Sequence, residues 1–269
     1  MVNLFVYIFY FYFILIAVLG FGLVIKNYLR INIIENCFGY LGLFGISIIL
    51  IYSYLSNLFF AHDKLHNFLF FSLGFLAFFY YYKNKFKPYK KELITTALIF
   101  LILLISIFIF KSYDDFAYYH FPYSYYLIEQ KVVIGIGQIL QGFRTPSSIF
   151  YFNSLLYLPY AEYYLFNFFP VYILGFANLI LIKKIFDNNL KQNNKFINYL
   201  GLLIFIFINI FFYRIAEHGT DRSAQILIFI LILEIFNQID KKEIGFKYLY
   251  KIFFLTSIII SLKAFYFLY

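Results

Sequence analysis

Apolar residues run through this chain in long blocks that short polar segments separate. Most blocks approach 20 residues, roughly the length that an α-helix needs to cross the ~30 Å apolar core of a bilayer. Transmembrane β-strands would instead alternate apolar and polar residues. The pattern therefore predicts eight membrane-spanning helices, at approximately Leu4–Ile25, Cys37–Phe60, Asn67–Tyr82, Leu93–Phe110, Leu165–Ile182, Phe196–Tyr213, Ser223–Phe236 and Ile252–Tyr269.

We expect an all-α fold, a polytopic transmembrane helical bundle that forms a single integral membrane domain. Residues 1–110 hold the first four helices, residues 111–164 form a long extracytoplasmic loop, and residues 165–269 hold four further helices. The first block lacks a basic n-region and a small-residue cleavage site, so we interpret it as a retained span and not as a signal peptide. The last block has no polar tail, and a truncated open reading frame stays open as an alternative.

The composition agrees with a membrane protein. The chain is 64% hydrophobic and 13% charged, whereas soluble domains are about a quarter charged. We attribute the 41 Phe and 29 Tyr, beside no Trp, to genome composition and not to a binding surface. The single cysteine excludes an internal disulfide and a thiolate metal site.

Positive charge separates the connecting segments into two sets. Fifteen of the 22 Lys and Arg follow the first, third, fifth and seventh spans. The positive-inside rule places these segments in the cytoplasm and the N-terminus outside, which predicts a cytoplasmic (inner) membrane protein with an extracytoplasmic active face. The net charge of +9 is then a topology signal and predicts no nucleic-acid partner. All four His and seven of the 13 acidic residues fall on the outer side.

The segment Lys111–Tyr164 joins the fourth and fifth spans with 54 residues. This is far more than a helix connection needs, and long ordered loops are usually functional. Apolar and aromatic residues dominate it although it faces outside, which predicts one or two amphipathic helices lying in the membrane interface. Gly135, Gly137, Gly142 and Pro146 mark the expected turns.

Asp114 and Asp115 open this segment, within about one helical turn of the membrane surface. Two interpretations stay open for the pair. It caps a helix, since Asp is a favoured N-cap residue, or it supplies a general base or a ligand for a divalent cation such as Mg²⁺ or Mn²⁺. We favour the second, which makes Asp115 and Asp114 the candidate catalytic residues. Tyr119 and His120 follow as candidate substrate-binding residues, although a lone His is more often a satisfied interfacial residue than a catalyst.

Further cations and an acid on the outer side are also candidates for substrate binding. Arg144 fits either a bidentate phosphate contact or a headgroup anchor. Asp221 and Arg222, at the edge of the seventh span, fit either a substrate site or a surface pair. Lys263 fits either a phosphate contact or a side chain that extends to the headgroups.

Two weaker patterns complete the candidates. Glu217 and Asp221 share a face at i, i+4 if their segment is helical. His62 and His66 have metal-ligand spacing on a helix, with Asp63 between them. In so short a hairpin this signal is weak, and we favour a structural role for both histidines.

The order of these pieces resembles the multi-pass glycosyltransferases of the GT-C superfamily. A span ending in an acidic pair is followed by a YHFP motif, a V-x-G-I-G-Q stretch and GTD at the head of a later span. More narrowly, the chain resembles a group of uncharacterised bacterial membrane proteins with a D-x-x-x-YH-x-P pattern, which it carries as Asp115, Tyr119, His120 and Pro122. The stretch TSIIISLKAFYFLY looks like the Lys-bearing span of that group, here with Lys263. The resemblance covers roughly residues 93–269.

This resemblance implies an enzyme that takes a sugar from a polyprenyl-phosphate carrier, a membrane lipid, and transfers it to an acceptor on the outer face. In the superfamily an acidic residue of the first large outer loop acts as base or metal ligand, which maps onto Asp115 or Asp114. The departing phosphate would be met by a cation, for which Arg144, Arg222 and Lys263 are the candidates.

Two other function classes stay open. An O-antigen polymerase or ligase would also use acidic residues and arginines of a large outer loop, and this loop holds one arginine, Arg144. A transporter or lipid flippase would carry ionisable residues near the membrane midplane. Glu234 is the main residue of that kind, and we favour the glycosyltransferase over both alternatives.

Overall fold

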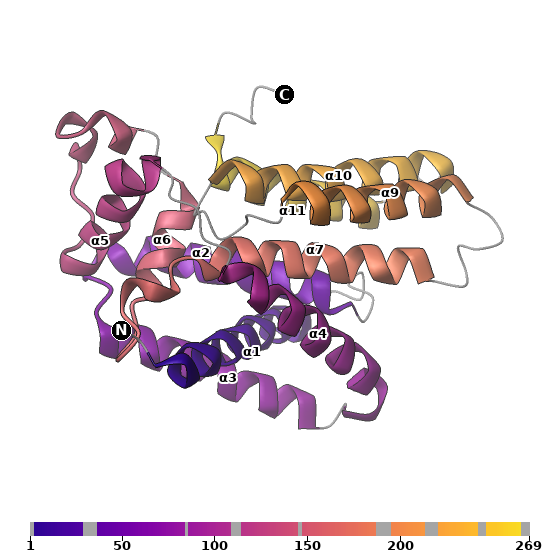
Figure 1. Cartoon of the computed structure of the whole chain (residues 1–269), viewed down its shortest axis with the longest axis horizontal. Coiled ribbons are helices and arrows are strands. Elements are labelled where there is room, and N and C mark those ends of the chain that lie inside the picture. The colour runs from indigo at the N-terminus through magenta and orange to yellow at the C-terminus, as the bar shows by residue number, and fades with distance from the viewer. Residues whose placement is uncertain are drawn as a thin grey trace.

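A computed structural model describes residues 3–28, 37–83, 86–108, 114–144, 147–186, 195–212, 220–241 and 246–264. Over these residues the fold is all-helical, as the sequence predicts, with one isolated β-bridge between Leu158 and Glu162. Helices of 17 to 25 residues coincide with the eight predicted spans. They are α1 (Leu4–Tyr28), α2 (Phe38–Asn57), α3 (Lys64–Tyr82), α4 (Phe86–Ile107), α7 (Phe168–Phe186), α9 (Lys195–Phe211), α10 (Thr220–Lys241) and α11 (Phe246–Leu262) (Figure 1).

Five helical stretches are long and apolar enough to cross a membrane. They are α1, α2, α3, the stretch Tyr163–Phe186 that contains α7, and Thr220–Ile239 within α10. Shorter apolar helices cover Phe196–Phe211 in α9 and Leu249–Leu262 in α11. This pattern indicates a membrane protein.

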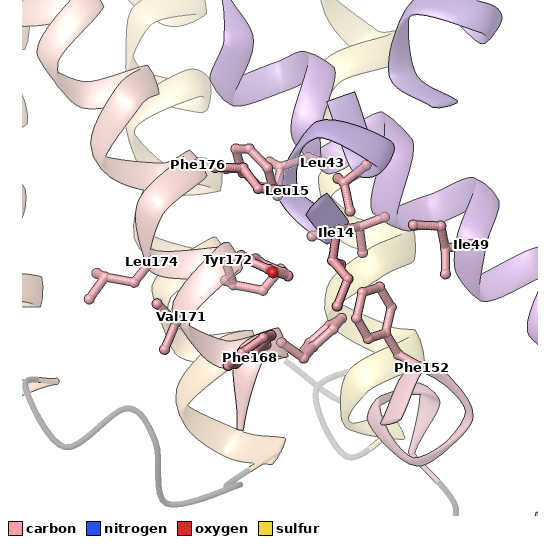
Figure 2. Close-up of a cluster of buried hydrophobic side chains, with 14 of the residues drawn as sticks. Ile14, Leu15, Leu43, Ile49, Phe152, Phe168, Val171, Tyr172, Leu174 and Phe176 are labelled. Carbon is pink, nitrogen blue, oxygen red and sulfur yellow. The ribbon is translucent and has the colours of Figure 1, made fainter. Parts of the chain in front are cut away.

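The central helix of the bundle is α7, which contacts α2, α4, α9 and α10. All its residues from Phe168 to Leu181 are buried, as expected of a helix that is apolar all round. Figure 2 shows Phe168, Tyr172 and Phe176 of α7 packed with side chains from neighbouring elements. The Tyr172 hydroxyl donates to the Phe11 carbonyl of α1 at 2.8 Å, so the polar end of this buried ring is satisfied.

Glycines allow α1 to approach α2 and α3 closely. A Cβ added at Gly45 of α2 would lie 1.9 Å from the Val18 carbonyl oxygen, and one at Gly20 would lie 1.9 Å from the Gly74 carbonyl oxygen. Small residues at such crossings are typical of membrane helix pairs, where packing and not water exclusion holds helices together.

Polar side chains also join helices of the bundle. Asn178 of α7 and Asn209 of α9 exchange amide hydrogen bonds of 2.9 and 2.8 Å. Glu234 of α10 is fully buried, pairs with Lys184 of α7 at 2.7 Å and accepts a hydrogen bond from the Tyr40 hydroxyl of α2. A buried carboxylate requires such partners, so α2, α7 and α10 are joined at this point.

The long segment after α4 folds into short helices at one end of the bundle, which also holds the N-terminus (Figure 1). These are η2 (Phe116–His120), α5 (Phe121–Glu129), η3 (Ile136–Gln138), η4 (Gln141–Arg144), α6 (Ser148–Leu155) and η5 (Tyr163–Leu165). We call this end of the molecule the α5 end. All residues of α6 are buried, and α6 contacts α2, α5 and α7. It therefore differs from the amphipathic interfacial helix that the sequence predicts, because protein surrounds it.

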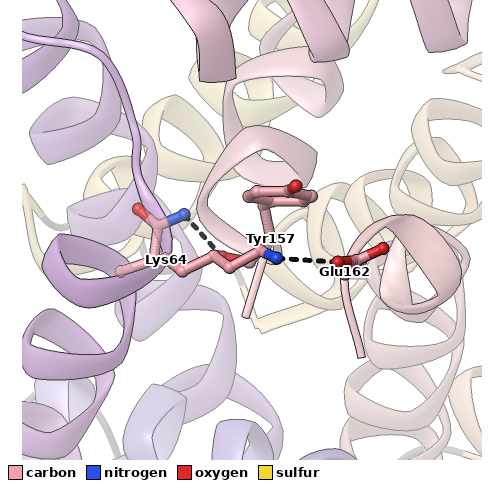
Figure 3. A network of polar contacts seen from close by, with 4 residues as sticks. Lys64, Tyr157 and Glu162 are labelled. Atoms are coloured by element: carbon pink, nitrogen blue, oxygen red, sulfur yellow. Dashed lines mark hydrogen bonds and ion pairs between the residues drawn. The ribbon is translucent and has the colours of Figure 1, made fainter. Parts of the chain in front are cut away.

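The turn after α6 contacts the start of α3 through an ion pair and a buried amide. Figure 3 shows Lys64 next to Glu162, with Nζ to Oε1 at 2.7 Å, and beside the ring of Tyr157, whose centroid is 5.0 Å from Nζ. The Asn67 amide donates to the Tyr157 carbonyl at 3.0 Å. Glu162 has a φ of 49°, an unusual value for a residue with a side chain, and these contacts hold the turn in place.

Candidate functional site

The acidic pair of the sequence lies directly before η2, a single turn of π-helix. The Phe121 amide donates to the Phe116 carbonyl, which is the i to i+5 bond of this geometry. Such turns occur frequently at functional sites. Asp115 forms no side-chain capping bond to η2, so the capping interpretation fails for it there. Asp114 is exposed, while Asp115 is partly buried.

Tyr119 brings distant parts of the chain together. Burial raises the pKa of its phenol, and the negative charges of Asp115 and Asp221 raise this pKa further. Asp221 belongs to the first turn of α10, about a hundred positions along the chain from η2. Both carboxylates therefore act on one phenol, which stays protonated at neutral pH and is a hydrogen-bond donor.

Asp221 also pairs with Lys263. Lys263 Nζ lies 2.8 Å from Asp221 Oδ1, and the two side chains are 35% and 51% exposed. The apolar run predicts a last span that continues to Tyr269, but α11 ends at Leu262. Lys263 therefore lies just past the helix end, and residues 265–269 of the predicted span lie outside the described part of the chain. The ion pair is open to solvent and accessible to a ligand.

Ser147 explains where α11 ends. Its hydroxyl donates to the Leu262 carbonyl at 2.5 Å and accepts from the Ile149 amide at 3.4 Å, so it joins the start of α6 to the end of α11. A terminal helix carbonyl needs a partner of this kind. Sequence reasoning missed Ser147: a Ser before an apolar run signals an N-cap, but the run does not reveal the carbonyl 115 positions away.

Arg144 is exposed at the end of η4. Its Nε donates to the Gly137 carbonyl at 3.0 Å, which orients the guanidinium group. Gly142 of η4 packs against Tyr119, since a Cβ there would lie 2.6 Å from the Tyr119 Cβ. The loop that carries Arg144 thus rests directly on η2.

His120 and Arg222 complete the candidates from the sequence. His120 is buried, with its ring centroid 4.3 Å from Tyr119 and 5.0 Å from Phe150. His120 is thus a buried residue that packs against the rings of Tyr119 and Phe150. Arg222 is partly exposed and follows Asp221 in the first turn of α10.

Comparison with known proteins gives a family for this fold. A family model described as a domain of unknown function (DUF8201) matches residues 4–269. The chain belongs to the DUF8201 family. The match covers the bundle, the short helices of the α5 end and the residues around Tyr119 alike. Comparison with curated proteins and with solved structures found no match.

Within the described part of this DUF8201 chain, no group of three His, Cys, Asp or Glu side chains forms a metal site. Glu217 and its predicted pairing with Asp221 lie outside the described residues. Mg²⁺ needs only one or two protein carboxylates beside substrate phosphates, so the candidate role of Asp115 or Asp114 as a metal ligand stays a prediction, and we derive no step through a metal ion.

The two histidines with metal-ligand spacing are engaged in hydrogen bonds in this DUF8201 structure. His62 is buried between the hydroxyls of Ser56 and Ser154, at 2.8 and 2.7 Å from its ring nitrogens. His66 lies 2.6 Å from the Tyr52 hydroxyl. Burial lowers the pKa of His62 to about 3, and the charge of His66 lowers it further. These contacts agree with the structural role that we favour from the sequence.

Proposed function

We propose that this DUF8201 protein is a membrane glycosyltransferase. It moves a sugar from a polyprenyl-phosphate donor to an acceptor on the outer face of the cytoplasmic membrane. One observation carries the proposal: the charges of Asp115 and Asp221 both act on the Tyr119 phenol at the α5 end, and Asp221 pairs with Lys263. These residues come from η2 and from the ends of α10 and α11, and each belongs to the motifs that resemble the GT-C superfamily.

The chemistry needs one base and a cation for the leaving group. The acceptor hydroxyl oxygen attacks the anomeric carbon, and the bond from that carbon to the phosphate oxygen breaks. Asp115 receives the hydroxyl proton. Lys263 and Arg144 meet the charge on the departing phosphate. An inverting displacement forms no covalent glycosyl-enzyme, so a nucleophilic second carboxylate is not required.

The remaining residues orient these groups. The neutral Tyr119 phenol, on which the charge of Asp115 acts, is available to donate a hydrogen bond to the substrate, and the His120 ring packs edge-on to the Tyr119 ring. Asp221 positions the Lys263 ammonium. An exposed ion pair stabilises little, so a phosphate can compete with Asp221 for Lys263 when the donor binds.

The proposal includes an orientation. The lysine-rich segments after α1, α3, α7 and α10 face the cytoplasm under the positive-inside rule, so the N-terminus and the α5 end face outside. The partners are then a lipid-linked sugar and the surrounding membrane lipid. Glu234, the basis of the transporter alternative, is bound by Lys184 and Tyr40, so we interpret it as a structural contact and propose no transport.

The test measures sugar transfer in isolated membranes. Membranes with wild type, Asp115→Asn or Glu129→Gln at equal abundance receive a panel of radiolabelled polyprenyl-phosphate sugars. Removal of a general base costs about 100-fold or more, so we expect Asp115→Asn to lose transfer by at least that factor. Glu129 is an exposed acid at the end of α5, and its variant serves as the matched control with wild-type activity.

Two results would contradict the proposal. Wild-type membranes that transfer sugar from no donor in the panel would remove the proposed activity. Unchanged transfer by the Asp115→Asn protein would show that Asp115 is not the base. Lys263→Ala in the same assay would then show whether the Asp221–Lys263 pair takes part.

A further inference from the structure

The loop between α5 and η4 presents apolar side chains to the surroundings. Ile134 is 99% exposed, and Val133 and Ile139 are also exposed. Gly135 has a φ of 90°, a left-handed value that glycine adopts at no steric cost, and it turns the chain directly after Ile134. A soluble surface rarely holds several large aliphatic groups together, and such a patch marks an interaction site.

A second apolar turn lies beside this loop. The segment between α2 and α3 exposes Leu58, Phe59 and Phe60, with Phe59 75% exposed. The Val132 amide donates to the Asn57 carbonyl at 3.1 Å, which ties the loop to the end of α2. We call the exposed residues of both turns the apolar rim; they are Leu58, Phe59, Phe60, Val133, Ile134 and Ile139.

The position of the rim indicates what covers it. Asn57 is the last residue of α2, a helix apolar and long enough to cross a membrane, so the rim begins where that span ends. Exposed Ile51 and Leu55 of α2 and Leu65 and Leu69 of α3 lie on the neighbouring helical turns, and the rim continues this lipid-facing surface.

Lysines flank the rim. Lys131 is exposed directly before Val132, and Lys64 opens α3 and remains 39% exposed in its ion pair. Lysines next to apolar groups are typical of the headgroup layer, where the stem lies in the apolar part and the ammonium group meets phosphates.

We propose that the apolar rim inserts into the membrane leaflet at the α5 end, to the depth of the boundary between headgroups and acyl chains. The occupant of this surface is lipid, because the rim continues the surface of two candidate spans and has lysines at its margin. The proposal does not depend on the enzymatic function.

Insertion has a consequence for the site. Arg144 is bonded to the Gly137 carbonyl, and Gly142 packs on Tyr119. The inserted loop therefore holds η4 and Arg144 at headgroup depth next to Tyr119. A phosphate in the same layer then reaches Arg144 by lateral diffusion in the membrane.

The test measures depth with a fluorophore. In a Cys37→Ser background, Ile134→Cys and Glu129→Cys are each labelled with an environment-sensitive dye. The proteins are reconstituted at a low protein-to-lipid ratio in vesicles of phosphatidylethanolamine and phosphatidylglycerol. Both positions are exposed, so neither substitution removes a packing contact. Ile139→Cys provides a second rim position.

We expect the dye at Ile134 and Ile139 to be quenched by nitroxide-labelled lipid and to be protected several-fold from iodide relative to Glu129. Equal iodide quenching at rim and control positions would overturn the proposal. Protection that disappears on dilution of protein into more lipid would also overturn it, since it would identify a second protein copy as the occupant.

Discussion

Tyr119 interacts with residues from several parts of the candidate site. The charges of Asp115, directly before η2, and of Asp221 in α10 both raise the pKa of its phenol. Gly142 packs against its Cβ. A neutral donor can bind a hydroxyl or phosphate oxygen without adding charge. We therefore expect Tyr119 to bind substrate in the proposed chemistry, although it carries no proton in the transfer itself.

His62 gives a prediction of pH-dependent stability. Its folded pKa is about 3, against 6.5 for an ordinary His. Between these values the unfolded chain binds a proton that the folded chain does not, so the contribution of His62 to stability is complete above about pH 6.5 and is lost as the pH falls toward 3. We expect the melting temperature in detergent to fall more steeply from about pH 7 to pH 5 in wild type than in His62→Gln.

Melting curves monitored by circular dichroism at several pH values check this. The variant is expected to be less stable than wild type at neutral pH, because Gln cannot reach both Ser56 and Ser154 in the way that the ring does. Parallel slopes for the two proteins would show that His62 does not titrate on unfolding.

The sequence identifies the acids and the cation of the candidate site but not the residues that bring them together. Asp115, Asp221 and Lys263 are visible because charge is rare in this chain and marks the span ends. Ser147 is not, since a Ser that bonds to a main-chain carbonyl of another helix leaves no pattern in the sequence. The burial of His120 was also missed, because it depends on the position of Phe150 in α6.

At the scale of helices, the apolar pattern predicts the order of the long helices in the described residues, of which five stretches are long and apolar enough to cross a membrane. It fails at their ends: α4 begins at Phe86, several residues before the apolar part, and α11 ends at Leu262 although apolar residues continue. Hydropathy measures how favourably a segment transfers into the membrane, whereas the position of a helix end depends on hydrogen-bond partners for the terminal backbone groups. The apolar residues of α6 predict contact with the membrane interface, but protein buries them. Hydropathy does not distinguish these surroundings, because protein interiors and lipid are both apolar.

Close helix crossings give a prediction of stability. Gly45→Ala would place a methyl group 1.9 Å from the Val18 carbonyl oxygen, which is main chain and can move only with α1. Overpacking of this kind costs about 1–3 kcal/mol. We expect a lower melting temperature in detergent and a larger fraction of aggregated protein in size-exclusion chromatography.

Gly201→Ala is the matched control. A Cβ at Gly201 of α9 lies 3.5 Å from its nearest neighbour, Ile185 Cγ1, an ordinary contact. Ala favours the helix by up to about 1 kcal/mol over Gly, so this variant should melt at or slightly above the wild-type temperature. A Gly45→Ala protein as stable as Gly201→Ala would show that α1 and α2 are not in close contact at this crossing.

At the scale of the whole molecule, the two ends of the bundle differ in charge and in structure. The last turns of α1 and α7, which carry Lys26, Lys183 and Lys184, lie at the end opposite to α5, and the candidate site lies at the α5 end (Figure 1). The proposed orientation predicts which positions a membrane-impermeant maleimide reaches in intact cells. In a Cys37→Ser background, Glu129→Cys should react directly, and Lys83→Cys should react only after the membrane is permeabilised.

Both positions are exposed in the structure, so a difference in labelling reports the side of the membrane and not burial. The reverse labelling pattern would place the candidate site in the cytoplasm, where a lipid-linked donor with its sugar on the outer face could not reach it. The glycosyltransferase proposal would then need a donor of the inner leaflet.

The buried contact of Glu234 has a consequence for how the protein is made. Its partners, Tyr40 and Lys184, both precede it in the chain. Because synthesis proceeds from the N-terminus, α2 and α7 are available in the bilayer before α10 leaves the ribosome. The carboxylate thus enters a membrane that already contains its hydroxyl donor and its counter-charge. If Glu234 preceded its partners in the chain, the carboxylate would stay unpaired in lipid until they were synthesised, and an ionised group is costly there. The order of α2, α7 and α10 along the chain therefore spares the Glu234 carboxylate an unpaired stage in lipid.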